Sequence, residues 1–245
     1  MTDSFVKINE VYQGDCLEVM KDIPDKSVDM ILCDLPYGTT ACKWDTIIPF
    51  EPLWKQYKRI IKDNGAIVLT ASQPFTSALV MSNPKMFKYE LIWEKQKGSN
   101  PLLAKKQIMK SHENIVIFYK SQPTYNPQFE QGTPYIRKGD CSVKSENYGL
   151  PKNKVYDLGS KDGRRYPKSI LRFSNEGMNA NNLHPTQKPV ALFEYLIKTY
   201  TNDGDLILDN CAGSGTTGVA CKNLNRNFIL IEKEPKYVEI IKGRL

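Results

Sequence analysis

Short apolar runs alternate with a helical pattern over the first half of the chain, to about Lys120. Four runs have the length and composition of buried strands, and apolar residues at helical spacing separate the first two. The expected strands are Val28–Cys33, Ala66–Thr70, Tyr89–Trp93 and Ile115–Tyr119, and the expected helix is Phe50–Ile61. Strands that alternate with helices predict a mainly parallel α/β sheet.

A strong pattern returns near the end of the chain. Pro189–Tyr200 is amphipathic and has a proline at its start, as the first turn of a helix tolerates. Two short apolar strands, Leu206–Leu208 and Phe228–Ile231, flank a second expected helix at Thr217–Leu224. This order predicts a βαβ unit.

The intervening residues 121–182 are polar and rich in Gly, Pro, Asn and Lys, with no long apolar period. A chain of 245 residues can bury one sizeable core. We therefore expect one α/β domain formed by residues 1–120 and 183–245, with residues 121–182 as a weakly structured insertion.

The net charge of +7 indicates a polyanionic partner, although a solvated basic surface explains it as well. Lys95–Lys110 holds five lysines and no acid, and residues 121–182 hold ten Lys or Arg against six Asp or Glu. No run of eighteen apolar residues occurs and Met1–Glu10 is polar, so we expect a cytoplasmic protein with no membrane span. The six cysteines form no CxxC pair and only two histidines are present, so we expect reduced thiols and no metal site.

A glycine-rich turn follows the strand at Leu206–Leu208. Gly213 and Gly215 permit close approach of the backbone to a ligand, and Asp209 stands at the strand's carboxyl end. Glu232 ends the next strand about twenty residues later, where an acid meets ribose hydroxyls in nucleoside-binding βαβ units. The pattern predicts a nucleoside site. Its glycines also match the dinucleotide fingerprint, whereas a P-loop is excluded because no Gly-Lys-Ser/Thr follows.

A second polar turn, Asp34-Leu-Pro-Tyr37, follows the expected strand Val28–Cys33. The Asp34 carboxylate, the Leu35 carbonyl and the Tyr37 ring suit an amino group on an aromatic ring. Its lone pair is delocalised into the ring, so two acceptors for its hydrogens and a stacking ring favour reaction at the nitrogen. An aspartate at a strand end also serves simply as a turn former.

Three segments together resemble the amino-group DNA methyltransferases of the β subclass. Asp34-Leu-Pro-Tyr37 resembles their Asp-Pro-Pro-Tyr signature, Asp209–Thr217 their Phe-x-Gly-x-Gly cofactor loop, and His184–Pro189 the segment before that loop. The catalytic loop comes first and the cofactor loop last, as in that subclass. Two departures are Leu35 in place of proline and Cys211 in place of phenylalanine.

The resemblance implies S-adenosyl-L-methionine as cofactor and a Rossmann-like, mainly parallel seven-stranded sheet with a small insertion lobe. It implies that Asp15 and Cys16 lie by the cofactor adenine, that Glu232 holds the ribose, and that Lys188 lies near the methionine carboxylate. The expected catalytic residues are Asp34, Leu35, Pro36 and Tyr37. The expected cofactor-binding residues are Asp15, Cys16, Asp34, Gln187, Lys188, Asp209, Cys211, Gly213, Ser214, Gly215, Thr216, Thr217 and Glu232. Lys188 is equally compatible with a solvent-facing helix start, and Cys16 with a small core residue.

The implied activity is site-specific methylation of N6 of adenine in duplex DNA, by direct in-line transfer to a base flipped onto Tyr37. N4-cytosine methylation is the alternative within the family, where serine usually replaces Asp34. An NAD-dependent oxidoreductase, a non-catalytic DNA-binding protein and an RNA or protein methyltransferase are further alternatives. No Pro-Cys pair accompanies the nucleoside site, which argues against methylation of a cytosine ring carbon.

Target recognition is expected in residues 121–182, where basic residues are interleaved with tyrosines, and DNA backbone contact also along Lys95–Lys110. The expected DNA-binding residues are Lys105, Lys106, Arg137, Lys138, Arg164, Arg165 and Lys168. Both a monomer and a homodimer are compatible with the sequence. A restriction endonuclease partner is not visible in it.

Overall fold

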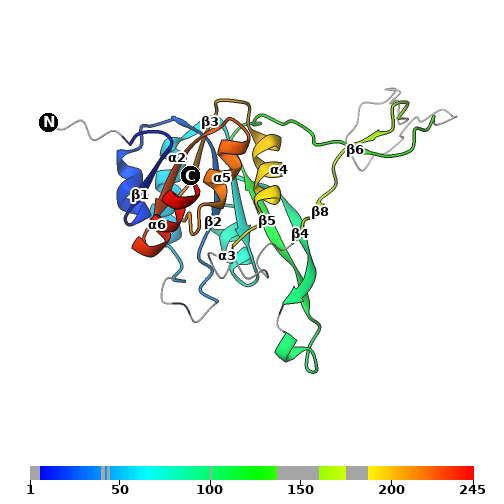
Figure 1. Ribbon diagram of the computed structural model, residues 1–245, viewed down its shortest axis with the longest axis horizontal. Coiled ribbons are helices and arrows are strands. Elements are labelled where there is room, and N and C mark those ends of the chain that lie inside the picture. The colour runs from blue at the N-terminus through cyan, green and yellow to red at the C-terminus, as the bar shows by residue number, and fades with distance from the viewer. Residues whose placement is uncertain (1–5, 40–41, 43–44, 100, 137–159, 175–186) are drawn as a thin grey trace. The chain divides into compact units, whose positions relative to one another are not determined.

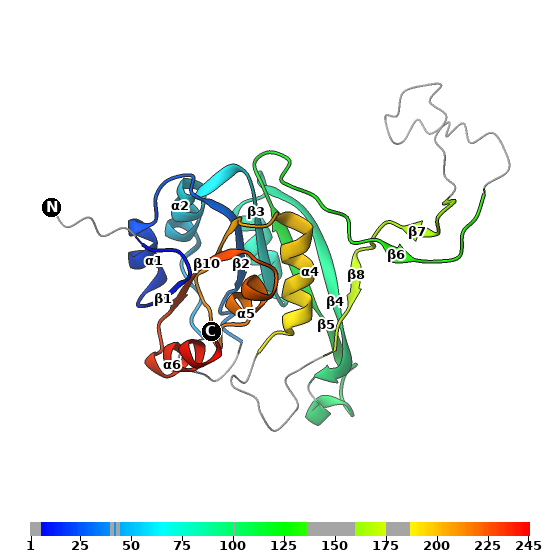
Figure 2. The same ribbon diagram turned by 45° about the horizontal axis from the view of Figure 1, so that its top comes forward.

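The structure, a computed structural model, describes residues 6–39, 42, 45–99, 101–136, 160–174 and 187–245. These form two compact units (Figures 1 and 2). The first runs up to Asn126 and resumes at Ser169, and the second lies between Pro127 and Lys168. The strands of the first unit are β1 (Glu10–Gln13), β2 (Val28–Asp34), β3 (Ile61–Ala71), β4 (Phe87–Ser99), β5 (Lys110–Phe118), β8 (Ile170–Arg172), β9 (Leu206–Asp209) and β10 (Asn227–Glu232). Its helices are α1 (Cys16–Val19), η1 (Met20–Asp22), α2 (Phe50–Ile60), α3 (Phe75–Ser82), η2 (Pro101–Leu103), α4 (Val190–Tyr200), α5 (Thr216–Asn223) and α6 (Pro235–Arg244).

One sheet organises the first unit, with strand order β1-β10-β9-β2-β3-β5-β4-β8. Every neighbouring pair is parallel except the two that involve β5, which runs against β3 and β4. The mainly parallel α/β fold predicted from the sequence is therefore confirmed. An eighth strand adds to the expected seven, because Ile170–Arg172 pairs with β4 at the sheet edge.

Helices cover both faces of this sheet, and the alternation of side chains along each strand decides which face a residue joins. Ile31 and Cys33 of β2 pack with apolar residues of η1, α2 and α3. Met30 and Leu32 point the other way and pack with α4, α5 and α6. Because both faces are covered, the central strands are apolar without interruption, which is the pattern seen in the sequence.

The strands β4 and β5 extend well beyond the apolar runs that predicted them. The prediction covered Tyr89–Trp93 and Ile115–Tyr119, whereas the paired strands reach outward to Ser99 and Lys110. The added length is polar because helices do not cover this part of the sheet. A prediction that depends on apolar residues therefore could not include it.

The second unit is small. Its strands β6 (Glu130–Gln131) and β7 (Arg164–Arg165) pair antiparallel, and Tyr135 bridges to Ser160. The two arginines of β7 lie over aromatic rings, Arg164 over Phe129 at 5.1 Å and Arg165 over Tyr135 at 4.6 Å. Among the described residues, no helix of either unit is long and apolar enough to cross a bilayer.

A buried aspartate shapes the loop between β9 and α5. Asp209 is almost fully buried and accepts hydrogen bonds from the backbone N–H of Cys211, at 3.1 Å, and from the hydroxyl of Thr217. Burial raises the pKa of Asp209 to about 6, although these two donors act in the opposite direction. The Asp209 carboxyl therefore stabilises the loop when it is protonated, and its ionisation lowers the free energy of unfolding.

Replacing Gly218 and Gly243 by alanine should have opposite effects on stability. Both glycines lie in helices, where alanine is favoured by up to about 1 kcal/mol. A Cβ on Gly243 meets nothing within 4 Å, so Gly243→Ala should raise the free energy of unfolding slightly. A Cβ on Gly218 would lie 2.7 Å from a methyl of the fully buried Leu230, so Gly218→Ala should lower it by about 1–3 kcal/mol. Urea unfolding of both variants tests this, and equal effects would contradict the packing argument.

The stability difference between the native protein and Asp209→Asn should depend on pH. Below about pH 4 the carboxyl is protonated in both the folded and the unfolded chain. As pH rises to about 6, the unfolded chain loses this proton while the folded one keeps it, so the free energy of unfolding falls. The native protein should therefore lose about 3 kcal/mol relative to Asp209→Asn between about pH 4 and pH 7. Urea unfolding across this range measures the difference, and a constant value would show that Asp209 ionises normally.

Candidate active site

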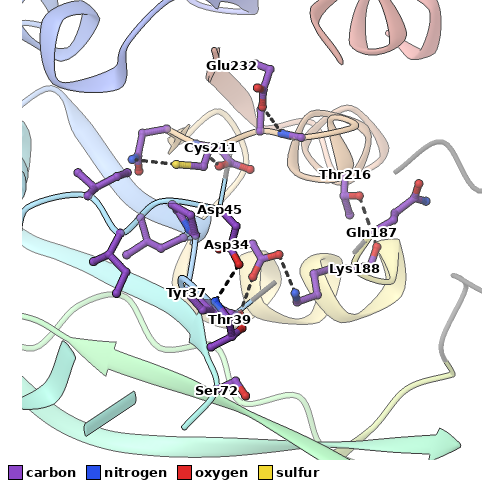
Figure 3. Close-up of a pocket in the computed structure, with 18 of the residues that line it drawn as sticks. Asp34, Tyr37, Thr39, Asp45, Ser72, Gln187, Lys188, Cys211, Thr216 and Glu232 are labelled. Carbon is purple, nitrogen blue, oxygen red and sulfur yellow. Dashed lines mark hydrogen bonds and ion pairs between the residues drawn. The ribbon is translucent and has the colours of Figure 1, made fainter. Parts of the chain in front are cut away.

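A cavity of about 900 Å³ opens at the carboxyl edge of the sheet. Parallel strands end there together, so the loops after β1, β2, β9 and β10 all contribute to its wall. The segment before α4 and the outer part of the β4–β5 hairpin complete it. In Figure 3, Glu232 and Ser72 lie toward opposite ends of this cavity, and Asp34 lies between them.

The carboxylate of Asp34 accepts hydrogen bonds from three side chains. Its Oδ1 accepts hydrogen bonds from the hydroxyl of Tyr37, at 2.6 Å, and from the hydroxyl of Thr70. Its Oδ2 accepts from the ammonium of Lys188 at 2.6 Å (Figure 3). A carboxylate offers about four lone-pair positions, so one remains for a further donor.

Lys188 is buried, with only 6 % of its side chain exposed. Its ammonium lies 2.6 Å from Asp34 and 3.3 Å from Oε2 of Glu113, and Glu113 also pairs with Lys95. Burial alone would lower the pKa of Lys188, but attraction to the two carboxylates outweighs it and the pKa is raised. Burial likewise opposes ionisation of Glu113, but Lys188 and Lys95 hold the pKa of its carboxyl below the usual value. The cavity therefore contains an ionic network in which Lys188 contacts both Asp34 and Glu113, and Glu113 also pairs with Lys95.

Tyr37 is fixed from two sides. Its hydroxyl donates to Asp34 and also lies 2.9 Å from the Thr70 hydroxyl, while its ring stacks on Phe75 at 5.3 Å between centroids. Burial, and then the nearby Asp34 carboxylate, raises the pKa of Tyr37 well above its usual value. The phenol therefore stays neutral and acts as a donor at any ordinary pH.

Asp45 closes the loop that carries Asp34 and Tyr37. Its two carboxylate oxygens accept the backbone N–H groups of Gly38, at 2.8 Å, and of Thr39, at 2.9 Å. Gly38 has a φ of 68°, a left-handed conformation that favours glycine. The turn at Gly38 and Thr39, which follows Asp34–Tyr37, is thus held by the side chain of Asp45.

The other end of the cavity is built around Glu232. One carboxylate oxygen accepts the N–H of Gly213 at 2.7 Å, and the other accepts the N–H of Glu234 at 2.8 Å. Burial raises the pKa of Glu232 above its usual value, with these N–H groups opposing the shift. Gly213 and Gly215 have φ values of 53° and 82°, so the tight turn requires them.

These groups fit S-adenosyl-L-methionine. Glu232 presents a carboxylate beside the glycine turn, where ribose hydroxyls can donate to its remaining lone pairs. At the other side of the turn, Ser214, Gln187 and Lys188 offer hydroxyl, amide and ammonium groups to the carboxylate and amine of the methionine part. The cavity is also large enough for a nucleoside and its amino-acid arm.

The structure brings together most residues that the sequence predicted. All four of the expected catalytic residues line the cavity, as do these expected cofactor residues: Asp15, Cys16, Asp34, Gln187, Lys188, Asp209, Cys211, Gly213, Ser214, Thr216 and Glu232. Gly215 and Thr217 do not line it. Gly215 packs on Ile241, and the buried hydroxyl of Thr217 donates to Asp209, so both shape the loop.

Lys188 was expected near the methionine carboxylate, or alternatively at a solvent-facing helix start. The second alternative is wrong, because the side chain is buried and its ammonium contacts Asp34 directly. Asp15 caps α1 through the N–H of Leu17 and also lies 3.6 Å from the ammonium of Lys233. Both Lys188 and Asp15 thus have partners within the protein that the resemblance did not indicate.

Cys211 stands where the family carries phenylalanine. Its thiol lies within hydrogen-bonding range of Cys16 and Cys33. Burial raises the pKa of Cys33 to about 12, so this thiol stays protonated. Within the described ranges, no cluster of three or more His, Cys, Asp or Glu side chains could hold a metal ion.

The predicted DNA-binding residues that the structure describes are not among those that line this cavity. Lys105 and Lys106 follow η2 at the end of the β4–β5 hairpin, and both are exposed. Arg164, Arg165 and Lys168 belong to the second unit, where both arginines stack on aromatic rings. Arg137 and Lys138 lie outside the described residues.

Sequence reasoning missed Asp45, Lys95 and the ionic role of Glu113. Asp45 lies in a stretch with no regular period, and nothing local marks it as the partner of Gly38. Lys95 was grouped with the basic stretch Lys95–Lys110, although it pairs with Glu113. Glu113 lies two residues before the buried apolar run that begins at Ile115, so an acid beside a predicted strand was the available signal.

Comparison with known proteins identifies the family. The DNA methylase family of the N6/N4 type matches residues 28–243. The chain is 29% identical over 253 aligned positions to the type II methyltransferase M1.MboII of Moraxella bovis, covering 95% of each protein. It is 30% identical over 259 positions to M2.MboI of the same organism, covering 96% of this chain and 86% of that protein.

Solved structures give the same result. The complex of M1.HpyAVI with S-adenosylmethionine superposes with a TM-score of 0.66 at 26% identity, covering 96% of this chain and 98% of that one. The cytosine-N4-specific PvuII DNA methyltransferase superposes with a TM-score of 0.69 at 17% identity, covering 98% and 87%, which shows a shared fold. The NAD-dependent oxidoreductase and non-catalytic alternatives therefore fail, and the chain belongs to the N6/N4 family of S-adenosyl-L-methionine-dependent DNA methyltransferases.

Proposed function

We propose that this enzyme methylates N6 of adenine in duplex DNA, by direct in-line transfer to a base flipped out of the helix. The observation that carries the proposal is the bonding of Asp34. Three donors from the protein hold its carboxylate at the cavity wall, and one lone-pair position remains for an incoming N–H. Asp34 therefore suits an exocyclic amine.

The cavity supports this reaction through acceptors rather than through a base that removes a proton first. Asp34 takes one hydrogen of the target amine and the Leu35 carbonyl takes the other, which draws the nitrogen lone pair out of the ring plane. When bound, S-adenosyl-L-methionine would supply an electrophilic methyl group from its sulfonium, and the sulfur would keep the electron pair of the broken C–S bond as a neutral thioether. The nitrogen becomes cationic as it accepts the methyl group, and its proton then passes to Asp34 or to water.

The neighbouring groups keep Asp34 ready for this role. Lys188 balances its charge and Tyr37, as a neutral phenol, donates to it, so both orient the carboxylate. Tyr37 also offers an aromatic ring to the face of the flipped base, while Phe75 supports that ring.

Adenine is favoured over cytosine by the aspartate itself, since N4-cytosine methyltransferases usually begin the same signature with serine. N4-cytosine methylation is the second candidate. The cytosine-specific title of the PvuII enzyme gives it some support, although that enzyme is only 17% identical to this chain.

Contact with DNA is proposed at two places. Lys105 and Lys106 lie on the hairpin that borders the cavity, and Arg164, Arg165 and Lys168 lie in the second unit, within the proposed target-recognition insertion of residues 121–182. A DNA substrate also suits action in the cytoplasm, as a monomer or a homodimer. The names of its relatives as type II methyltransferases suggest a restriction endonuclease partner.

The base assignment is tested by the product. Wild-type protein is incubated with labelled S-adenosyl-L-methionine and plasmid DNA, and the digested nucleosides are identified by mass spectrometry. N6-methyladenine is expected. N4-methylcytosine would overturn the choice of base, and absence of methylated DNA from a protein that binds the cofactor would overturn the DNA reaction.

Asp34→Ala should abolish most of the turnover while leaving cofactor and DNA binding in place. Loss of a preorganised acceptor at the reacting group typically reduces kcat by about 10²–10³-fold. Glu113 still pairs with Lys188 in this variant, so the buried ammonium keeps one partner. Steady-state methylation and cofactor titration measure the two properties. The exposed Asp63, which pairs with Lys26 and Lys120, gives the control variant Asp63→Ala, which should keep full activity.

Removing two lysines from the hairpin should weaken the salt dependence of DNA binding. Lys105→Gln/Lys106→Gln should reduce the slope of log K against log salt by about 2, because each lysine that contacts a phosphate releases about one counterion. Lys55→Gln/Lys58→Gln removes two exposed lysines of α2 and is the matched control. Binding isotherms at several salt concentrations measure both slopes, and equal slopes would place the phosphate contacts elsewhere.

A further inference from the structure

The β4–β5 hairpin continues past the sheet at the edge where the cavity opens. β3 ends at Ala71, opposite Asn114 of β5, whereas β4 and β5 remain paired outward to Ser99 and Lys110. Between the pairs Trp93–Glu113 and Ser99–Lys110, β5 adds three residues to the ladder, about 10 Å of extended chain, while the register of β4 is irregular. Figure 1 shows the hairpin with η2 at its end, projecting away from the rest of the sheet.

The tip of this hairpin, residues 101–110, exposes apolar side chains. Leu102 and Ile108 are each 95% exposed, and Leu103 and Met109 are each 39% exposed. Leucine and isoleucine gain from leaving water, so a tip that presents both almost completely to solvent indicates a surface that another molecule covers.

The charges around the tip identify the kind of molecule. Lys97, Lys105 and Lys106 have no ion-pair partner among the described residues, and no acid occurs between Lys95 and Lys110. A partner with regularly spaced negative charge outside and an apolar interior fits this surface. Duplex DNA has both properties, because its phosphates surround stacked bases.

The base of the same hairpin lines the cavity. Lys95, Ser99 and Lys110 contribute to its wall, and Lys95 pairs with Glu113, which in turn contacts Lys188. The tip and the Asp34 site are therefore joined by one continuous two-stranded element. A DNA strand whose base reaches Asp34 passes beside the tip.

We infer that Leu102 and Ile108 enter the duplex at the position vacated by the flipped nucleotide, while Lys105 and Lys106 bind the flanking phosphates. The inference rests on the proposed function. Apolar side chains that fill a gap in the base stack offset the cost of unpairing, as the wedges of DNA-bending proteins do. The contribution of Leu102 and Ile108 to kcat/KM should therefore be larger when the target base is paired than when it is mispaired.

The test uses Leu102→Ser/Ile108→Ser and a short duplex that carries a site methylated by the wild-type enzyme, identified by sequencing of methylated plasmid. On this duplex kcat/KM of the variant should fall at least about tenfold. On the same duplex with the target base mispaired, the variant should come within about threefold of the wild type, because a mispaired base leaves the stack more easily.

Met81→Ser is the matched control, since Met81 is 72% exposed on α3, and it should keep wild-type rates on both duplexes. The unfolding midpoint and cofactor affinity of the hairpin variant should match those of the wild type. An equal loss on both duplexes, or no loss on either, would overturn the inference. So would a change from dimer to monomer in sedimentation, which would assign the tip to self-association. A wild-type enzyme that methylates no DNA would instead overturn the proposed function.

Discussion

The constraint on which this structure depends is that parallel strands end together at one edge of a sheet. Asp34, Asp209 and Glu232 each end a strand, and although almost two hundred residues separate the first from the last, they line one cavity. The same geometry places the turn after β1 beside the turn after β10. The parallel pairing of the strands thus brings the loop with Asp34 and the glycine turn beside Glu232 to one cavity.

The antiparallel strand β5 places its first residues at the edge of the sheet where the parallel strands end. Because β5 runs against β3 and β4, its first residues lie at the edge where its neighbours end. Glu113 therefore reaches the cavity from a strand that enters the sheet there, and it contacts Lys188 in the segment before α4. The hairpin that results is both a wall of the cavity and an extension beyond it.

The buried Lys188 joins these parts energetically. Removing an ammonium from water is costly, and two carboxylates from different strands offset that cost. The ion pairs therefore couple the catalytic loop after β2, the start of β5 and the segment before α4. The contact with Lys188 both balances the charge of Asp34 and fixes the position of its carboxylate.

The sequence by itself determined the local features. The strands β2, β9 and β10 were predicted within a few residues, and so was the central part of β3, because burial on both faces leaves a continuous apolar run. The helices α2, α4 and α5 were predicted as closely from apolar residues at helical spacing. The signature Asp34–Tyr37 and the glycines at 213 and 215 also predicted the site, since their chemistry depends on short spacing and on left-handed backbone. The strands β1 and β8 are too short to carry such a signal, and α6 was not predicted either.

Only the tertiary structure decided which distant side chains meet. The pairing of Lys188 with Asp34 and Glu113 depends on packing between segments far apart in the chain. The bonds of Asp45 to Gly38 and of Thr217 to Asp209 join residues close in sequence, but no local pattern marks these partners. Lysine is usually exposed, so its sequence context gives no reason to expect burial. The position of the Lys188 side chain is set by two carboxylates that the sheet brings together. The spacing of residues along the chain does not show that these two carboxylates lie close to each other.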